Sequence, residues 1–335
     1  MNGPASCRLN RAPPRRWPGL ERKEVMANIK DYVVYNEEVG RALKKGRPVV
    51  AFESTIITYG LPYPENLKVA RGVEEIARKN GAVPATISIV GGKIRIGADA
   101  STLAFLADPK NRGGIAKVSR HNMAAVIGAG GHGVTTVAGT MMICDAVGIN
   151  VFVTGGIGGV HLGARDTFDI SADLREFEKS KVAVVSSGVK SILDIKLTLE
   201  YLETCGVPII GYKTSDFPAF YSRKSGFFAG TKASDMKELA AIVKASFALG
   251  DSGLLIANPV PVKSELSSAM ISKLVDKILK AASPSDIAGP KYTPYILGRL
   301  HEMSEGKTLK ANIALIRDNA RVGSMLAREL KDDEK

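Results

Sequence analysis

From about residue 26 onward, short apolar segments alternate with longer amphipathic ones, and this alternation restricts the possible folds more than any other feature. The apolar segments have the length of buried strands, and the amphipathic ones have helical periodicity. Strands are expected at residues 47–55, 84–97 (a hairpin turning at Gly91–Gly92), 123–128, 150–156, 181–188, 207–212 and 253–261, and helices at 65–81, 135–148, 190–206 and from 265 onward. Repeated strand–helix–strand units predict a three-layer α/β/α sandwich with a mixed, mostly parallel sheet and a helical C-terminal region.

The first 25 residues differ from the rest of the 335-residue chain, whose formal net charge is +12. They are rich in arginine and proline and lack apolar periodicity, so we expect a basic, disordered tail or a start of translation near Met26. They also lack the apolar stretch of a secretory signal. Because no linker-like stretch or internal repeat follows, residues 26–335 are expected to form one domain.

Composition argues against several classes of protein. No apolar run approaches the ~18 residues of a membrane helix, and basic residues are not interleaved with aromatic ones as in proteins that bind single-stranded nucleic acid. We therefore expect neither a membrane nor a nucleic-acid partner. The three cysteines lie far apart without a CxxC pair, as expected in a reducing cytoplasm.

The segment from Val182 to Asp194 contains the first candidate for chemistry. An apolar strand passes through a Ser-Ser-Gly turn to Lys190, where a helix is expected to begin. The positive end of the helix dipole would lower the pKa of this lysine and leave an amine able to form a Schiff base with a sugar aldehyde. The alternative is a surface lysine paired with Asp194.

Glu53 is the second candidate, because it follows an apolar strand and precedes a turn rich in glycine and proline. The carboxyl ends of parallel strands are where α/β sheets bind ligands. Partial burial there would raise the pKa of the carboxyl group and suit it to proton transfer. The alternative is an exposed acid at the end of a strand.

The glycine-rich segment from Val153 to Leu174 would let backbone amides approach a ligand closely. His161 is the polar side chain among these glycines, and it is either a site residue or a histidine satisfied within the loop. Asp169, with water, could hold Mg²⁺ or Mn²⁺. Ser171 could equally cap a helix with Asp173 in its first turn, and both interpretations can hold together.

Residues 128–133 contain a GxGxxG pattern, expected here between a strand and a helix. It supports the main alternative, a nicotinamide-linked oxidoreductase, although the next strand ends without the acid that would bind the ribose. The same region could hold a phosphate on the amides of Thr136 and Val137. Lys117 could bind phosphate as a point charge or be a solvated surface lysine. A catalytically silent phosphosugar-binding protein is the third hypothesis.

Eight ordered segments between about Arg47 and Leu330 resemble the pseudouridine-5′-phosphate glycosidase family, also called the indigoidine synthase A-like family. They are ESTIITYGLPYPEN, VFVTGGIGGVH, FDISADL, GVKSILDIKLTLEYLET, FPAFYSRKSG, ANPVP, YTPYILGRL and TLKANIALIRDNA. The resemblance implies a reversible cleavage of the C–C glycosidic bond of pseudouridine 5′-phosphate to uracil and ribose 5-phosphate, in nucleotide catabolism. It also implies an α/β/α sandwich, Mn²⁺ and a homotrimer.

The same resemblance implies roles for individual residues. Lys190 would be the nucleophile that forms a Schiff base with C1′ of the ring-opened sugar, Glu53 the proton donor and Asp169 the residue associated with Mn²⁺. The substrate-binding residues would be Lys117, Thr136, Val137, His161, Ser171, Ala172, Asp173 and Asn312. An iminium suits this chemistry, because a C–C bond has no leaving oxygen for the paired carboxylates of ordinary glycosidases to protonate.

Two positions depart from the family pattern. Tyr59 stands where the family commonly has histidine, and the sequence RHNM, which contains Asn122, stands where an Arg-Arg-Asp-Leu type of sequence is common. Neither position carries an expected catalytic role. We expect these departures to affect discrimination of the base rather than the class of reaction.

Overall fold

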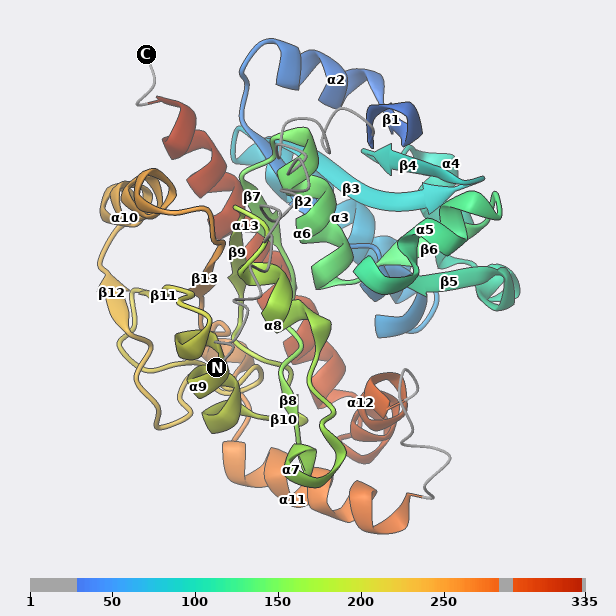
Figure 1. Cartoon of the computed structure of the whole chain (residues 1–335). Helices are drawn as coiled ribbons and strands as arrows, with labels where there is room; N and C mark the ends of the chain where they lie inside the picture. Colours follow the sequence, from blue (N-terminus) through green and yellow to red (C-terminus); the bar gives the residue numbers. More distant parts are fainter. Residues whose placement is uncertain (1–28, 283–291, 333–335) are drawn as a thin grey trace, which may run out of the picture. The chain divides into compact units, whose positions relative to one another are not determined.

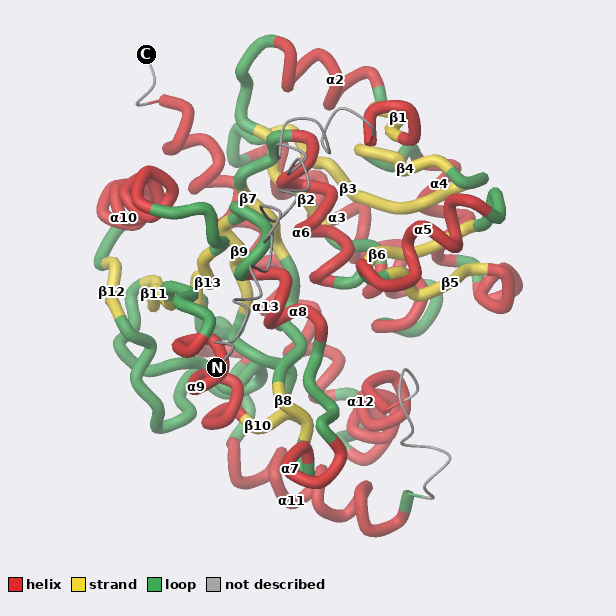
Figure 2. The backbone as a smooth tube through the Cα atoms, in the orientation of Figure 1, coloured by secondary structure: helices red, strands yellow, loops and turns green. Residues whose placement is uncertain are grey.

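The computed structural model describes residues 29–282 and 292–332 (Figures 1 and 2). The chain divides into two compact units, residues 1–31 and residues 32–335. Apart from the short helix η1 (Lys30–Tyr32), which begins in the first unit, the features below lie in the described part of the second. The expected basic tail, residues 1–25, lies outside the described residues. No helix in the described ranges has both the length and the apolar character needed to cross a membrane.

A large sheet organises the second unit. In the described part of the chain its strand order is β1-β4-β3-β2-β7-β9-β13-β11-β12, with β6 paired to β3 and β5 paired to β6. The strands are β1 (Val33–Tyr35), β2 (Val49–Phe52), β3 (Val83–Val90), β4 (Lys93–Ile96), β5 (Ile115–Val118), β6 (His132–Thr135), β7 (Val151–Val153), β9 (Ala183–Ser186), β11 (Ile209–Tyr212), β12 (Thr231–Ala233) and β13 (Leu254–Ala257). A separate antiparallel pair joins β8 (Val160–His161) to β10 (Leu193–Asp194).

Most of the strand pairs are parallel. From β3 through β2, β7, β9, β13 and β11 to β12, each neighbour runs in the same direction. β3 and β4 instead form the expected antiparallel hairpin, whose turn residues Gly91 and Gly92 have φ angles of 58° and 70°, a region open to glycine without steric cost. β9 and β13 are buried at every position, and all of their residues except Ser186 are apolar, as expected for strands covered on both faces. The predicted mixed, mostly parallel sheet is confirmed.

Helices cover the sheet in layers. α13 packs against β2, β7, β9 and α3, and α6 packs against β2 and β7; Figure 1 shows α6 in front of these strands and α13 behind them. The helices are α2 (Glu37–Lys44), α3 (Glu65–Lys79), α4 (Ala100–Ala107), α5 (Arg120–Gly128), α6 (Val137–Val147), α7 (Ala164–Thr167), α8 (Ala172–Phe177), α9 (Ile195–Thr204), α10 (Met236–Leu249), α11 (Ser268–Ala281), α12 (Tyr292–Met303) and α13 (Lys307–Asp332), with short η1 (Lys30–Tyr32), η2 (Ile56–Gly60), η3 (Pro109–Gly114) and η4 (Val262–Ser264). The α/β/α architecture is confirmed.

Residues 123–128 belong to helix α5, so the strand predicted there is wrong. Asn122 caps the start of this helix: its Oδ1 accepts the Ser119 N–H at 2.8 Å, and its own N–H donates to the Ser119 carbonyl at 3.3 Å. A short apolar run is compatible with either a strand or a helix. Here the cap at Ser119 starts a helix that continues through residues 123–128. The GxGxxG pattern at residues 128–133 therefore leaves a helix and enters strand β6. It lacks the strand–turn–helix context of a dinucleotide site.

Lys190 does not lie at the start of a helix, so the predicted effect of a helix dipole on its amine is wrong. α9 begins five residues later, at Ile195, because Asp194 caps it by accepting the Leu197 N–H at 2.9 Å. The Lys190 N–H is already paired, since it donates to the carbonyl of Ile157 at 3.1 Å. Lys190 therefore lies in a loop between β9 and β10.

Candidate active site

A cavity of about 430 Å³ lies at the carboxyl ends of β2 and β7, the edge of a parallel sheet where ligands bind. Segments from β2 to α13 contribute to its walls. All eleven residues predicted from the sequence line it: Glu53, Lys117, Thr136, Val137, His161, Asp169, Ser171, Ala172, Asp173, Lys190 and Asn312. The fold thus brings the predicted set together, while the role of each residue stays a prediction.

Glu53 directly follows β2 and is only 9% exposed. Its Oε1 accepts a hydrogen bond from the hydroxyl of Thr154, which directly follows the adjacent strand β7. Burial raises the pKa of Glu53, while the charge of Lys190 and the Thr154 hydrogen bond oppose this shift. A carboxyl group with a raised pKa keeps its proton to higher pH, as a proton donor requires.

Two lysines bring amines to the same cavity. Burial lowers the pKa of Lys117, and the positive charge of Lys190 lowers it further, while Asp173 and Glu53 act in the opposite direction. Because the two cations repel each other in partly buried surroundings, an anion between them would lower the energy of both. The cavity is therefore suited to a ligand that carries a phosphate group.

Backbone hydrogen bonds hold the loop that carries Lys190 against the glycine-rich segment after β7. The Ser187 N–H donates to the Gly155 carbonyl at 2.9 Å, and the Ile157 N–H donates to the Gly188 carbonyl at 3.0 Å. The third hydrogen bond between the two segments is the one that the Lys190 N–H donates to the Ile157 carbonyl. The backbone of Lys190 is therefore fixed relative to the strand end that contacts Glu53.

Both carboxylate oxygens of Asp173 accept hydrogen bonds from backbone N–H groups. Its Oδ1 accepts the Ala138 N–H, in the first turn of α6, and its Oδ2 accepts the Gly158 N–H, each at 2.8 Å. The predicted cap is confirmed, since Ser171 Oγ accepts the Asp173 N–H at 3.2 Å. Asp173 thus joins three walls of the cavity. Because the Asp173 carboxylate is used in this way, the groups of Ser171, Ala172 and Asp173 that could bind a ligand are mainly the Ser171 hydroxyl and the backbone amides.

At the start of α6, only one of the two amides predicted to bind phosphate, those of Thr136 and Val137, is left by the hydrogen bonds described here. The Thr136 N–H donates to the Val118 carbonyl at 2.8 Å, and the Thr136 hydroxyl accepts the Gly139 N–H at 3.2 Å. Since Ala138 is bound by Asp173, Val137 is the amide that these bonds leave for an anion at this helix start.

His161 and Asp169 lie together on another wall, with His161 Nδ1 3.7 Å from Asp169 Oδ2. Burial lowers the pKa of His161, and the Asp169 carboxylate opposes this shift. Asp169 is a single carboxylate: no three His, Cys, Asp or Glu residues in the described ranges form a metal-binding cluster. Its side chain is 46% exposed. These residues fit a hard cation that takes most ligands from water or substrate, as Mg²⁺ and Mn²⁺ do.

Several residues that line the cavity lie outside the predicted set, and Thr154, Tyr59 and Asn122 are those whose contacts bear on the site. Thr154 contacts Glu53, and its position near the carboxyl end of the strand predicted at residues 150–156 was a usable signal. Tyr59 and Asn122, the two departures from the family pattern, also line the cavity. The Tyr59 hydroxyl donates to the Ile115 carbonyl. Asn122 Nδ2 donates to the Lys117 carbonyl at 3.0 Å, so both side chains also support the backbone of the β5 wall.

An amine, a buried carboxyl group and a second cation around one cavity can perform covalent chemistry on a phosphosugar. The amine can bond to a sugar carbon, the carboxyl group can supply a proton, and the second cation can hold the phosphate.

Residues 38–329 match the family described as indigoidine synthase A like protein. A protein named pseudouridine-5′-phosphate glycosidase from Alkaliphilus metalliredigens is 48% identical over 90% of this chain and 98% of its own length. One of the same name from Caldanaerobacter subterraneus is 49% identical over 89% of this chain and 97% of its own length.

Two solved structures share the fold. The structure of an indigoidine synthase A-like protein from Thermotoga maritima is 36% identical, with a TM-score of 0.80 over 89% of this chain and 96% of its own. The structure of the prealnumycin C-glycosynthase AlnA in complex with ribulose 5-phosphate is 37% identical, with a TM-score of 0.82 over 90% of this chain and 98% of its own.

Proposed function

The chain belongs to the indigoidine synthase A-like protein family and has the activity of a pseudouridine-5′-phosphate glycosidase, and we propose that it acts through a Schiff base on Lys190. The reaction cleaves the C–C glycosidic bond of pseudouridine 5′-phosphate reversibly, giving uracil and ribose 5-phosphate. The C-glycosynthase that holds ribulose 5-phosphate supports a phosphosugar as the ligand of this cavity.

The first half of the proposed mechanism opens the sugar. Breaking the bond between C1′ and the ring oxygen leaves that oxygen in need of a proton, which Glu53 in its protonated form can give. The Lys190 amine then bonds to C1′ and loses a proton, which the Glu53 carboxylate formed in the first transfer can accept. The raised pKa of Glu53 supports its part, because it favours the protonated form.

The second half breaks the C–C bond. Carbon 5 of the uracil takes the proton that Glu53 accepted from the amine, and the bond to C1′ breaks with its electron pair remaining on the uracil. The nitrogen lone pair of Lys190 forms an iminium at C1′. Water then adds to C1′ and releases ribose 5-phosphate and the free lysine. Lys117, the Val137 amide and the Ser171 hydroxyl would bind the phosphate and sugar throughout.

Three further features of the proposal rest on the family resemblance. Mn²⁺ would be held by Asp169 and by water, and it would orient oxygens of the substrate. The protein would be a homotrimer and would work in the cytoplasm. Light scattering during size-exclusion chromatography tests whether the protein is a trimer. Removal of metal with a chelator tests whether the reaction needs the ion.

The observation that carries the proposal is that Lys190, Glu53 and Lys117 line one cavity. Incubation with ribose 5-phosphate and borohydride should reduce the iminium and leave a stable mass adduct, which peptide mapping should place on Lys190. Lys190→Ala should abolish both the adduct and the release of uracil. Lys196→Ala is the matched control, because Lys196 is an exposed lysine on α9, outside the cavity. If Lys190→Ala still releases uracil, the mechanism is wrong.

A further inference from the structure

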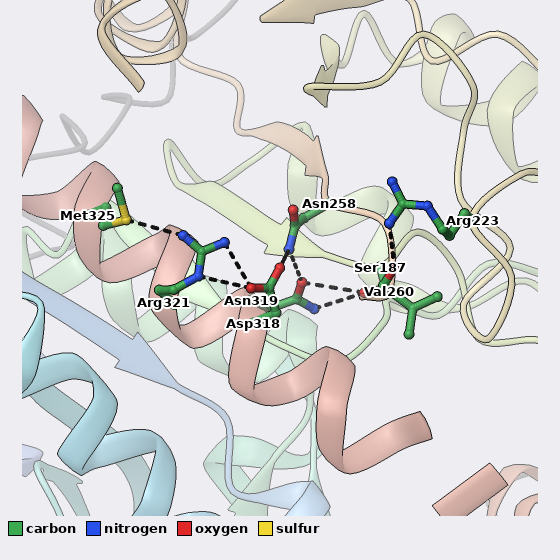
Figure 3. A network of polar contacts seen from close by, with 8 residues as sticks. All are labelled: Ser187, Arg223, Asn258, Val260, Asp318, Asn319, Arg321 and Met325. Carbon is green, nitrogen blue, oxygen red and sulfur yellow. Dashed lines mark hydrogen bonds and ion pairs between the residues drawn. The ribbon is translucent and has the colours of Figure 1, made fainter. Parts of the chain in front are cut away.

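Asn319, on α13, is a fully buried amide whose donors and acceptor are all used. Figure 3 shows its contacts with Ser187 and Asn258. Its Nδ2 donates to the Thr154 carbonyl at 2.9 Å and to the Ser187 hydroxyl at 3.2 Å. Its Oδ1 accepts a hydrogen bond from Asn258 Nδ2 at 2.9 Å. An amide is the side chain that offers two donors and an acceptor on one flat group, so no other residue of this size matches these partners.

The three partners of Asn319 occupy equivalent places in the sheet. Thr154 directly follows β7, Ser187 directly follows β9, and Asn258 directly follows β13. These strands are consecutive neighbours in the sheet. One helix side chain therefore ties together the carboxyl ends of three adjacent strands, at the edge where the cavity lies.

Two of these strand ends lead to the proposed catalytic groups. The hydroxyl of Thr154 donates to Glu53, and Ser187 lies three residues before Lys190 in the loop that carries it. Neither Ser187 nor Asn258 nor Asn319 lines the cavity. Asn319 can therefore influence the reaction only through the residues that it holds.

We propose that Asn319 is a positioning residue that sets the placement of the Glu53 carboxyl group relative to the Lys190 amine. The proposal rests on the proposed function, because it takes these two groups as the acid and the nucleophile. The proposed phosphate and sugar contacts Lys117, Val137 and Ser171 lie on β5, at the start of α6 and directly before α8. The side-chain hydrogen bonds of Asn319 in the described part of the chain go instead to the segments after β7, β9 and β13. Loss of the amide should therefore affect the chemical step more than binding.

Asn319→Asp keeps the shape of the side chain but turns an acceptor toward the Thr154 carbonyl. A displacement of about 1 Å can cost ~100-fold in rate, so we expect kcat for pseudouridine 5′-phosphate to fall ~100-fold and KM to change less than about threefold. Thr308→Val is the matched control: Thr308 is buried on the same helix and shares a hydrogen bond with Ser304, and the cavity excludes both. Its kcat should stay near the unmodified value.

Ser187→Ala provides the second variant, since it removes one partner without placing a charge in the core. It should lower kcat by ~10-fold with little change in KM, and it decides the matter if Asn319→Asp does not fold. The proposal would be overturned if kcat were unchanged in the folded variants, or if Thr308→Val lost as much kcat as they do. It would also be overturned if KM rose by as large a factor as kcat fell. Absence of the borohydride adduct on Lys190 in the unmodified protein would instead overturn the proposed function.

Discussion

The Thr154 hydroxyl donates a hydrogen bond to Glu53 Oε1 across the adjacent strand ends of β7 and β2. The same hydroxyl lies 3.5 Å from the Gly156 carbonyl. A hydroxyl carries one hydrogen, so it can serve only one acceptor at a time. When Glu53 is ionised, it can take that hydrogen; when Glu53 is protonated, it can donate to the hydroxyl, which can then turn to Gly156. The pair can therefore accommodate both protonation states of the acid.

Replacing Thr154 with valine tests this relationship. The hydrogen bond lowers the pKa of Glu53 and burial raises it, so Thr154→Val should raise the pKa further. Because the proposed mechanism requires the protonated form of Glu53, the alkaline fall of kcat should move to higher pH. A kcat–pH profile measures the shift. Thr204→Val, at an exposed threonine of α9, should leave the profile unchanged, and an unmoved alkaline limb in Thr154→Val would contradict the assignment of Glu53.

Glu53→Gln removes the transferable proton while keeping the size of the side chain. Loss of a general acid typically costs 10²–10⁴-fold, so we expect kcat to fall by about that factor with little change in KM. Uracil release followed by ultraviolet absorbance measures it. A variant that retains more than about a tenth of the kcat would not be compatible with Glu53 as the donor.

The same variant should change the pH dependence of stability. The pKa of Glu53 in the folded protein is raised above its ordinary value of 4.5, so its contribution to stability is complete below that pH and is lost as pH rises through the folded pKa. Glutamine does not titrate. Glu53→Gln should therefore gain stability relative to the unmodified protein as pH increases above 4.5, and thermal denaturation at several pH values should show the growing difference.

Gly158→Ala should impair substrate binding. An added Cβ at this position would lie 2.2 Å from Ser171 Oγ and 2.6 Å from Asp173 Oδ2, so the wall at the start of α8 must move. We expect KM for pseudouridine 5′-phosphate to rise about tenfold, or about 1.4 kcal/mol of binding free energy. Gly128→Ala is the control, because its added Cβ would meet nothing within 4 Å. If Gly128→Ala raised KM as much as Gly158→Ala does, the GxGxxG pattern would have a part in ligand binding, and titration with NADH would then test it as a dinucleotide site.

Arg120→Met should destabilise the fold. Arg120 Nε and one terminal nitrogen donate to both carboxylate oxygens of Glu176, at 2.6 and 2.5 Å, and the Glu176 side chain is 2% exposed. Removing one partner of a fully buried pair costs about 3–5 kcal/mol; because Arg120 is 40% exposed, we expect about 1–3 kcal/mol. Urea denaturation measures the loss. The double variant with Glu176→Gln should recover part of it, since no unpaired carboxylate then remains.

Local signals predicted most of the elements. Thr136 caps α6 and Gly148 ends it in the left-handed conformation, both as expected from residue type. The errors at residues 123–128 and at Lys190 have the same cause. In each case a cap on a nearby residue, Ser119 or Asp194, set where the helix begins, and apolar periodicity does not register a cap.

The sequence by itself determined the alternation of strands and helices, the parallel sheet and a set of residues that line one cavity, because periodicity, caps and strand ends act between neighbours in the chain. It also identified the family through eight ordered segments. Only the tertiary structure decided which groups meet. Glu53 and Thr154 are 101 residues apart, and Thr154 and Asn319 are 165 apart. Their contacts depend on the order of strands in the sheet and on the packing of α13 against it, and no short-range pattern records either of these.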